Sequence, residues 1–166
     1  MSSYIKLIIF IVVLLLISVA VVFIDSSMDN INQSMPEISS GIIQGDKDYN
    51  ESVELLNSRN YDEADNKAKS AGDNYNDSLH KLEKIQKKYD KDLTEVHKEY
   101  LDTTINELEV KLKAVDELKE SIHYLGMYYN YTGSTHGSEA NDLMVNAVNY
   151  QNKRVNIVQE NPELFN

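Results

Sequence analysis

The sequence predicts an all-α protein in which a single N-terminal transmembrane helix precedes an antiparallel helical bundle. Three observations lead to this prediction. Residues 7–24 read LIIFIVVLLLISVAVVFI and carry no charge. The remaining chain repeats its apolar residues at spacings of three and four, without the alternation of a strand. Only six glycines and two prolines interrupt 166 residues, so we expect long helices.

The apolar run 7–24 has the length of a membrane anchor. At about 1.5 Å per residue this helix is roughly 27 Å long, close to the ~30 Å hydrocarbon core. Lys6 precedes the run and Asp25 follows it. The positive-inside rule then places residues 1–6 in the cytoplasm and the C-terminal domain outside the cell membrane. A cleaved secretory signal peptide is the alternative, with a small-residue cleavage site at 18–20.

Residues 25–45 are predicted to form a stalk or linker after the anchor. Apolar residues continue at helical spacing as far as Met35, and Pro36 together with Gly41 and Gly45 then breaks the helix. The chain therefore divides into a short cytoplasmic N-terminus (1–6), a transmembrane anchor (7–24), the stalk (25–45) and a helical bundle domain (46–166).

The bundle domain is predicted to contain one very long helix. A first helix covers 46–71 and ends at a Gly-Asp pair, and the second covers 73–125, which contains neither Gly nor Pro. A break at the polar segment 87–91 would divide the long helix in two. A tyrosine-rich loop is expected at 126–137, and a last helix begins at Ser138. The bundle has three helices, or four if the long one is broken.

The composition excludes several functions. The chain has no cysteine, which excludes disulfides, thiolate zinc sites and cysteine nucleophiles. Its net charge of −11 opposes the binding of nucleic acid. We find no catalytic motif and predict that the protein is not an enzyme.

Two carboxylate–histidine pairs are the candidates for a metal site. Asp77 and His80 lie one helical turn apart, as do Glu120 and His123, and di-iron bundles use pairs with this spacing. Leucine and isoleucine already occupy the inward stripe beside both pairs. We therefore assign no metal, cofactor or catalytic residue, and metal binding remains the least favoured function.

Two further surface features bear on partners. The tyrosines Tyr124, Tyr128, Tyr129 and Tyr131 form either an interaction surface or a cap on the core. Sequons for N-glycosylation occur at Asn32, Asn50, Asn76 and Asn130.

These features predict a single-pass membrane-anchored protein whose acidic helical ectodomain is an interaction or structural module at the cell envelope. Its expected partners are membrane lipid, through residues 7–24, and another envelope protein or a second copy of the chain. A sensor-like, ligand-binding bundle that needs a signalling partner is the alternative. A polar pocket between helices would favour that alternative.

Overall fold

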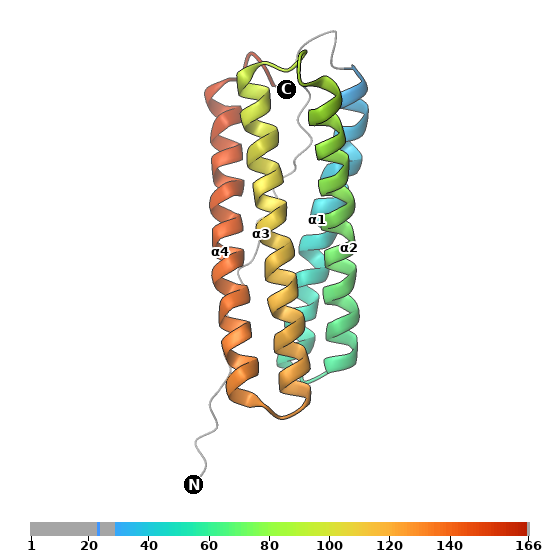
Figure 1. Cartoon of the computed structure of the whole chain (residues 1–166), viewed down its shortest axis with the longest axis vertical. Helices are drawn as coiled ribbons and strands as arrows, with labels where there is room; N and C mark the ends of the chain where they lie inside the picture. Colours follow the sequence, from blue (N-terminus) through green and yellow to red (C-terminus); the bar gives the residue numbers. More distant parts are fainter. Residues whose placement is uncertain (1–22, 24–28, 166) are drawn as a thin grey trace.

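The computed structural model describes residue 23 and residues 29–165, which contain four α-helices and no β-strand (Figure 1). The helices are α1 (Asp29–Asn57), α2 (Tyr61–Tyr89), α3 (Glu95–Gly126) and α4 (Asn130–Glu160). They run up and down in chain order, joined by short turns. The all-α class is confirmed, and so is the count of four helices, whereas the predicted first helix 46–71 and the predicted helix start at 73 do not match α1 and α2.

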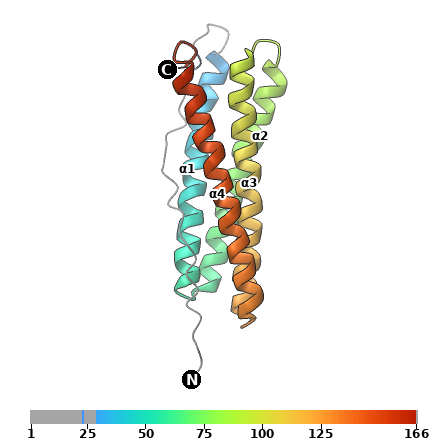
Figure 2. The same cartoon turned by 90° about the vertical axis from the view of Figure 1, so that its left-hand side faces the viewer.

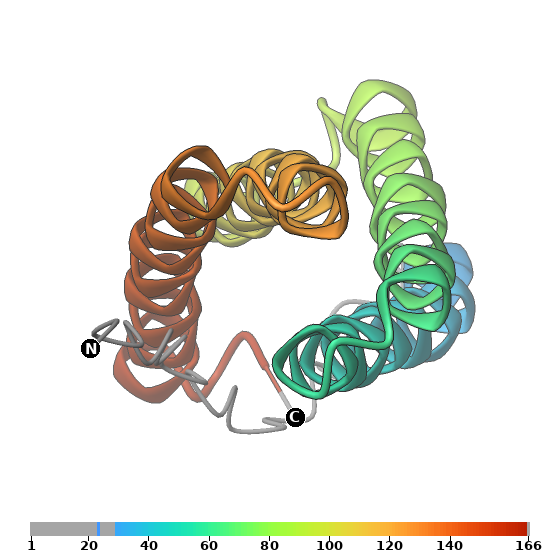
Figure 3. The same cartoon turned by 90° about the horizontal axis from the view of Figure 1, so that it is seen from below.

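The helices form an arc in chain order. Each packs along the next one in the sequence, α1 also approaches α3 across the bundle, and α1 and α4 make no close backbone approach (Figures 2 and 3). Any link between the first and last helices in the described part of the chain must therefore run through side chains or through α2 and α3.

Helix α1 includes residues 29–45 of the predicted stalk, so the predicted break at Pro36, Gly41 and Gly45 is wrong. Proline inside a helix costs about 3 kcal/mol, because it removes one hydrogen bond and crowds the preceding turn. Four apolar side chains along this part of α1 are almost completely buried: Ile31, Met35, Ile38 and Ile42. Burial of each contributes about 1.5–3 kcal/mol, which outweighs the cost of the proline.

The predicted helix end at Gly72 is also wrong, because α2 continues through it and the chain turns instead at residues 58–60. Arg59 adopts a left-handed conformation with φ of 61°. Its N–H donates to the Leu56 carbonyl at 2.9 Å, and the Asn60 N–H donates to the Leu55 carbonyl at 2.9 Å. This is a Schellman helix end, for which glycine is the usual residue at the left-handed position.

The turn between α3 and α4 has the same construction and is shorter than the predicted loop 126–137. Tyr128 is left-handed with φ of 66°, and the Tyr129 N–H donates to the Tyr124 carbonyl at 2.9 Å. Helix α4 then begins at Asn130. Gly133 does not end a helix, because it lies buried against α3, where its carbonyl accepts the Ser121 hydroxyl at 2.8 Å.

The predicted break within 87–91 is confirmed, since α2 ends at Tyr89. The next helix is capped by Thr94, whose hydroxyl accepts a hydrogen bond from the His97 N–H at 3.2 Å. The polar composition of this segment allowed the end of α2 to be found from the sequence.

Within the described residues, none of the helices is both long and apolar enough to cross a bilayer. The predicted anchor and its lipid contact fall outside those residues, except at Phe23. That side chain is 1% exposed, and its ring lies 4.6 Å from His97 and 5.6 Å from Phe165. Its N–H donates to Asn32 Oδ1 at 2.8 Å. Phe23 is therefore part of the bundle core, and we correct the prediction of a single-pass cell-membrane protein, which these findings contradict.

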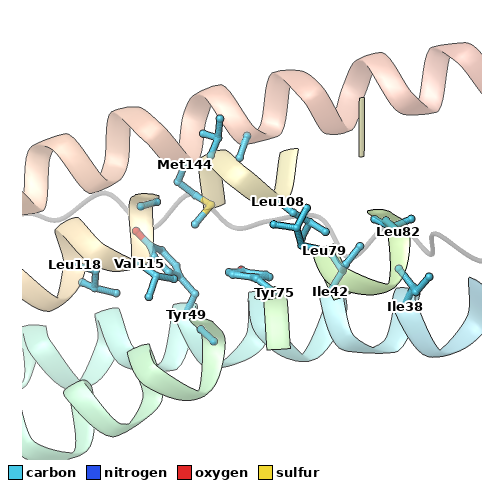
Figure 4. Packing of buried hydrophobic residues seen from close by; sticks show 14 of the residues in the cluster. Ile38, Ile42, Tyr49, Tyr75, Leu79, Leu82, Leu108, Val115, Leu118 and Met144 are labelled. Atoms are coloured by element: carbon cyan, nitrogen blue, oxygen red, sulfur yellow. The ribbon is translucent and has the colours of Figure 1, made fainter. Parts of the chain in front are cut away.

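The apolar core runs along the length of the bundle. In Figure 4, Ile38 and Ile42 of α1 lie beside Leu79 and Leu82 of α2, and Met144 reaches in from α4. Every helix thus contributes its apolar stripe to one continuous core, which holds the turns and the polar groups described below in fixed positions.

Two helical glycines are expected to respond in opposite ways to alanine. A Cβ at Gly133 would lie 2.6 Å from Leu125 Cγ and 3.0 Å from the Leu125 backbone nitrogen, so Gly133→Ala should lower the free energy of unfolding by about 1–3 kcal/mol. A Cβ at Gly72 would meet only Val115 Cγ1, at 3.4 Å. Gly72→Ala should therefore raise the free energy of unfolding by about 0.5–1 kcal/mol.

Urea unfolding followed by circular dichroism measures both changes. A Gly133→Ala variant as stable as Gly72→Ala would contradict the close packing of α3 on α4.

Candidate functional site

Two acidic and two basic side chains lie inside the bundle and form what we call the core charge network: Asp46, Glu107, Lys111 and Arg154. Lys111 Nζ lies 2.7 Å from Asp46 Oδ1 and 2.8 Å from Glu107 Oε1. Arg154 Nε lies 3.2 Å from Glu107 Oε2. None of the four residues is more than 3% exposed. The network has no net charge and connects α1, α3 and α4.

Tyrosines line the network. The Tyr75 hydroxyl donates to Asp46 Oδ1 at 2.7 Å, and Lys111 Nζ lies 5.4 Å from the centre of the Tyr75 ring. Burial raises the pKa of Asp46, and the adjacent Lys111 ammonium and Tyr75 hydroxyl only partly offset this effect. Burial also raises the pKa of Tyr75 and of Tyr100, which lies beside Arg154.

The arrangement is suited to holding helices in place. Its charges are mutually paired and closed off from water, so no reacting group or ligand can reach them from outside. Removing one partner of a buried ion pair leaves the other charge uncompensated, which typically costs about 3–5 kcal/mol. Sliding one helix along another would separate the same pairs, so the network favours a single alignment of α1, α3 and α4.

A second polar contact joins α1 to α2 around Asp48. The carboxylate accepts hydrogen bonds from Ser70 at 2.8 Å, from Gln44 at 3.1 Å and from Lys67 at 3.2 Å. Burial by itself would raise the pKa of Asp48, but these hydrogen bonds and the Lys67 charge together lower it. The pKa of Asp46 is thus raised, whereas the pKa of the nearby Asp48 is lowered.

The two carboxylate–histidine pairs considered from the sequence are not brought together. His80 is an exposed residue of α2, with its Nδ1 3.2 Å from Glu83. His123 is an exposed residue of α3, and its ring meets Tyr124 edge to face. Neither Asp77 nor Glu120 faces the core, since both are exposed.

Another histidine lies in a group with the donor atoms of a metal site. Glu117, His136 and Glu139 place one ligand atom each within 4.8 Å of one another, and this is the one such group among residues 23 and 29–165. His136 Nδ1 is 2.6 Å from Glu117 Oε2. No local pattern indicates this group, because Glu117 and His136 are 19 residues apart and belong to different helices.

Large apolar side chains gather on the surface at the turn between α3 and α4. We call Met127, Tyr128, Tyr129 and Tyr131 the tyrosine tip. Their exposed fractions are 54%, 86%, 61% and 88%. Among the described residues, the other large apolar side chain with comparable exposure is Val145. Tyr124, predicted with this cluster, is half-buried instead and stacks on His136.

A hollow of about 410 Å³ lies between α1 and α2. Its α1 wall includes Glu37, and its α2 wall carries the lysines Lys81, Lys84 and Lys88. Lys81 is already paired with Glu37 at 2.9 Å. The other two ammonium groups give this part of an acidic protein the chemistry to accept an anionic group.

The opposite pKa shifts of Asp48 and Asp46 predict opposite effects of pH on stability. Because folding lowers the pKa of Asp48, this carboxylate stabilises the fold at pH values above its usual pKa of 3.8. The contribution is lost as the pH falls through the lowered pKa. Asp48→Asn lowers the free energy of unfolding relative to the unsubstituted chain, and this difference should shrink as the pH is lowered from about 6 to about 2.5.

Asp46 should follow the reverse trend. A raised pKa stabilises the fold below 3.8, and that contribution is lost as pH rises through the raised pKa. The stability advantage of the unsubstituted chain over Asp46→Asn should grow on acidification. Urea unfolding across this pH range measures both differences, and parallel trends for the two variants would refute the assignment.

Comparison with known proteins gives no relative. No protein-family model matches the chain, and neither a curated protein nor a solved structure matches it. Proposals about function therefore rest on the side chains and geometry described above.

Proposed function

We propose that the protein is a helical-bundle interaction module that binds a partner protein through the tyrosine tip. The observation that carries this proposal is Tyr128, which is 86% exposed and has φ of 66°. Tyrosine is favoured in protein interfaces, because it offers a large contact area with few rotatable bonds.

Stability alone does not account for Tyr128. A left-handed conformation costs an ordinary residue about 1–2 kcal/mol, and glycine avoids this cost. The side chain does not recover the cost by burial, because it projects into solvent. A residue other than glycine is expected at a left-handed position where function requires its side chain.

The tip is held on a firm support. Only residues 127–129 separate the two helices, and hydrogen bonds close the turn on both sides of Tyr128. Directly after the turn, α4 has two small buried residues, Gly133 and Gly137, where it packs against α3. A surface that is already ordered loses little conformational entropy on binding, which favours affinity.

The charge around the tip indicates the chemistry of the partner. A Cβ placed on Gly126 would lie 3.6 Å from Tyr61, so the start of α2 is adjacent to the end of α3. The next residues of α2, Asp62 and Glu63, are exposed acids. A complementary partner has an apolar centre with a basic rim. Self-association is disfavoured, because each copy carries a net charge of −11.

Tyr128→Gly separates binding from folding. Removing the left-handed strain should raise the free energy of unfolding by about 1 kcal/mol, whereas loss of the ring should weaken partner binding at least about tenfold. A photo-crosslinking amino acid at position 131, introduced in cells that make the protein, measures the binding. We expect one principal adduct with a partner of basic surface, which is greatly reduced when Tyr128→Gly is added.

The same crosslinker at Val145 is the matched control, because this residue is exposed on α4 outside the tip. Identical adducts from positions 131 and 145, an adduct unaffected by Tyr128→Gly, or an adduct only with a second copy of the chain would each contradict the proposal.

A ligand-binding bundle is the second candidate, and the lysine-lined hollow between α1 and α2 favours it. That function would use Lys84 and Lys88 to hold an anionic ligand. Ligand binding would depend on this hollow, whereas the interaction module depends on the tyrosine tip.

A further inference from the structure

We propose that Glu117, His136 and Glu139 form a binding site for a transition-metal dication of the Zn²⁺ class. Their ligand atoms lie within 4.8 Å of one another. Around a tetrahedral Zn²⁺ with bonds of ~2.1 Å, neighbouring ligand atoms are about 3.4 Å apart. Side-chain rotations that move the ligand atoms by about an ångström would therefore bring all three onto one ion.

The backbone already places the three side chains on one face. His136 and Glu139 are one turn apart on α4, and Glu117 belongs to the facing helix α3. Beside the two α4 ligands lie Gly137 and Ala140, both buried. Small residues at these positions let the two helices approach closely, so a side chain of α3 reaches the same point in space as those of α4.

The imidazole is held in position before any ion binds. The Tyr124 ring stacks on His136 with an interplanar angle of 5° and a separation of 5.4 Å between ring centres. Glu117 Oε2 lies 2.6 Å from His136 Nδ1, so these two side chains already converge on one point. A ring whose orientation is already restricted loses less conformational entropy when an ion binds, which favours assembly of the site.

The donor set selects the type of metal. One imidazole nitrogen with two carboxylates suits Zn²⁺ and related transition metals, whereas Ca²⁺ and Mg²⁺ prefer oxygen ligands alone. A hollow of about 360 Å³ adjoins the site and is lined in part by Glu117, Glu139 and Asp142. The hollow leaves room for water or a fourth ligand, and Asp142 lies one further turn along α4 as a carboxylate that can supply it.

Isothermal titration of the full chain with Zn²⁺ alone tests this proposal. We expect one Zn²⁺ per chain, with affinity falling on acidification because the imidazole must lose its proton to bind. His136→Gln and Glu139→Gln should each weaken binding at least about tenfold. Glu139 is exposed, so its substitution leaves the fold intact even if His136→Gln does not.

His123→Gln is the matched control, because it removes an exposed imidazole from the same end of α3. It should leave the titration unchanged. The absence of stoichiometric Zn²⁺ binding would overturn the proposal, and so would binding that survives Glu139→Gln or is weakened equally by His123→Gln. None of these outcomes affects the tyrosine tip, whose crosslinking requires no added metal.

Discussion

Four side chains of acids and bases are paired inside the core, and the alignment of the helices depends on them. Taking each charge out of water costs several kcal/mol, and only close pairing offsets this cost. The pairs Asp46–Lys111, Lys111–Glu107 and Glu107–Arg154 join α1 to α3 and α3 to α4. Since α1 and α4 do not approach each other directly, this network links them through α3. Apolar contacts tolerate a shift of one helix along another far better than these pairs do.

The two proposed sites depend on this alignment. Glu117 lies on α3 and His136 on α4, so a shift of one helical turn, about 5.4 Å, would separate the metal donors completely. The tyrosine tip depends on the same two helices, because its turn is only three residues long. Tyr124 contacts both features, stacking on His136 and meeting Tyr129 edge to face at 6.4 Å. The core charge network thus supports the metal donors and the tyrosine tip at the end of the bundle, although its own residues are buried in the core.

Apolar periodicity predicted the helical class, and the polar segment 87–91 predicted where α2 ends. The turn at 58–60 could not be found in this way, because Arg59 occupies a left-handed position where glycine is expected. The turn at 127–129 was predicted, but as part of the longer loop 126–137. The glycines themselves misled the prediction. Gly45 and Gly133 lie inside helices, where Tyr75 and Leu125 approach too closely for a Cβ. Close packing, and not chain reversal, explains their presence.

The functional residues were harder to predict than the helices. Glu107 and Lys111 have the i,i+4 spacing of surface pairs such as Glu109–Lys113, and nothing local distinguishes a buried pair from an exposed one. The metal donors come together only through the packing of α3 on α4. The tyrosines at 124, 128, 129 and 131 were noticed as a cluster in the sequence, but the sequence left open whether they are exposed or cap the core. The apolar run 7–24 indicated a membrane span, yet Phe23 belongs to the core beside Phe165.

If the core charge network fixes the alignment of α1, α3 and α4, the distance between α1 and α4 depends on it. Because the chain has no cysteine, spin labels can be placed at Lys47→Cys on α1 and Asn152→Cys on α4, both exposed positions. Pulsed electron resonance then measures the distance distribution between α1 and α4. We expect one narrow distribution for the otherwise unchanged chain. When apolar residues of similar size replace all four charges, the protein should stay folded and the distribution should become broad or divided. An equally narrow, unshifted distribution in that variant would contradict the account.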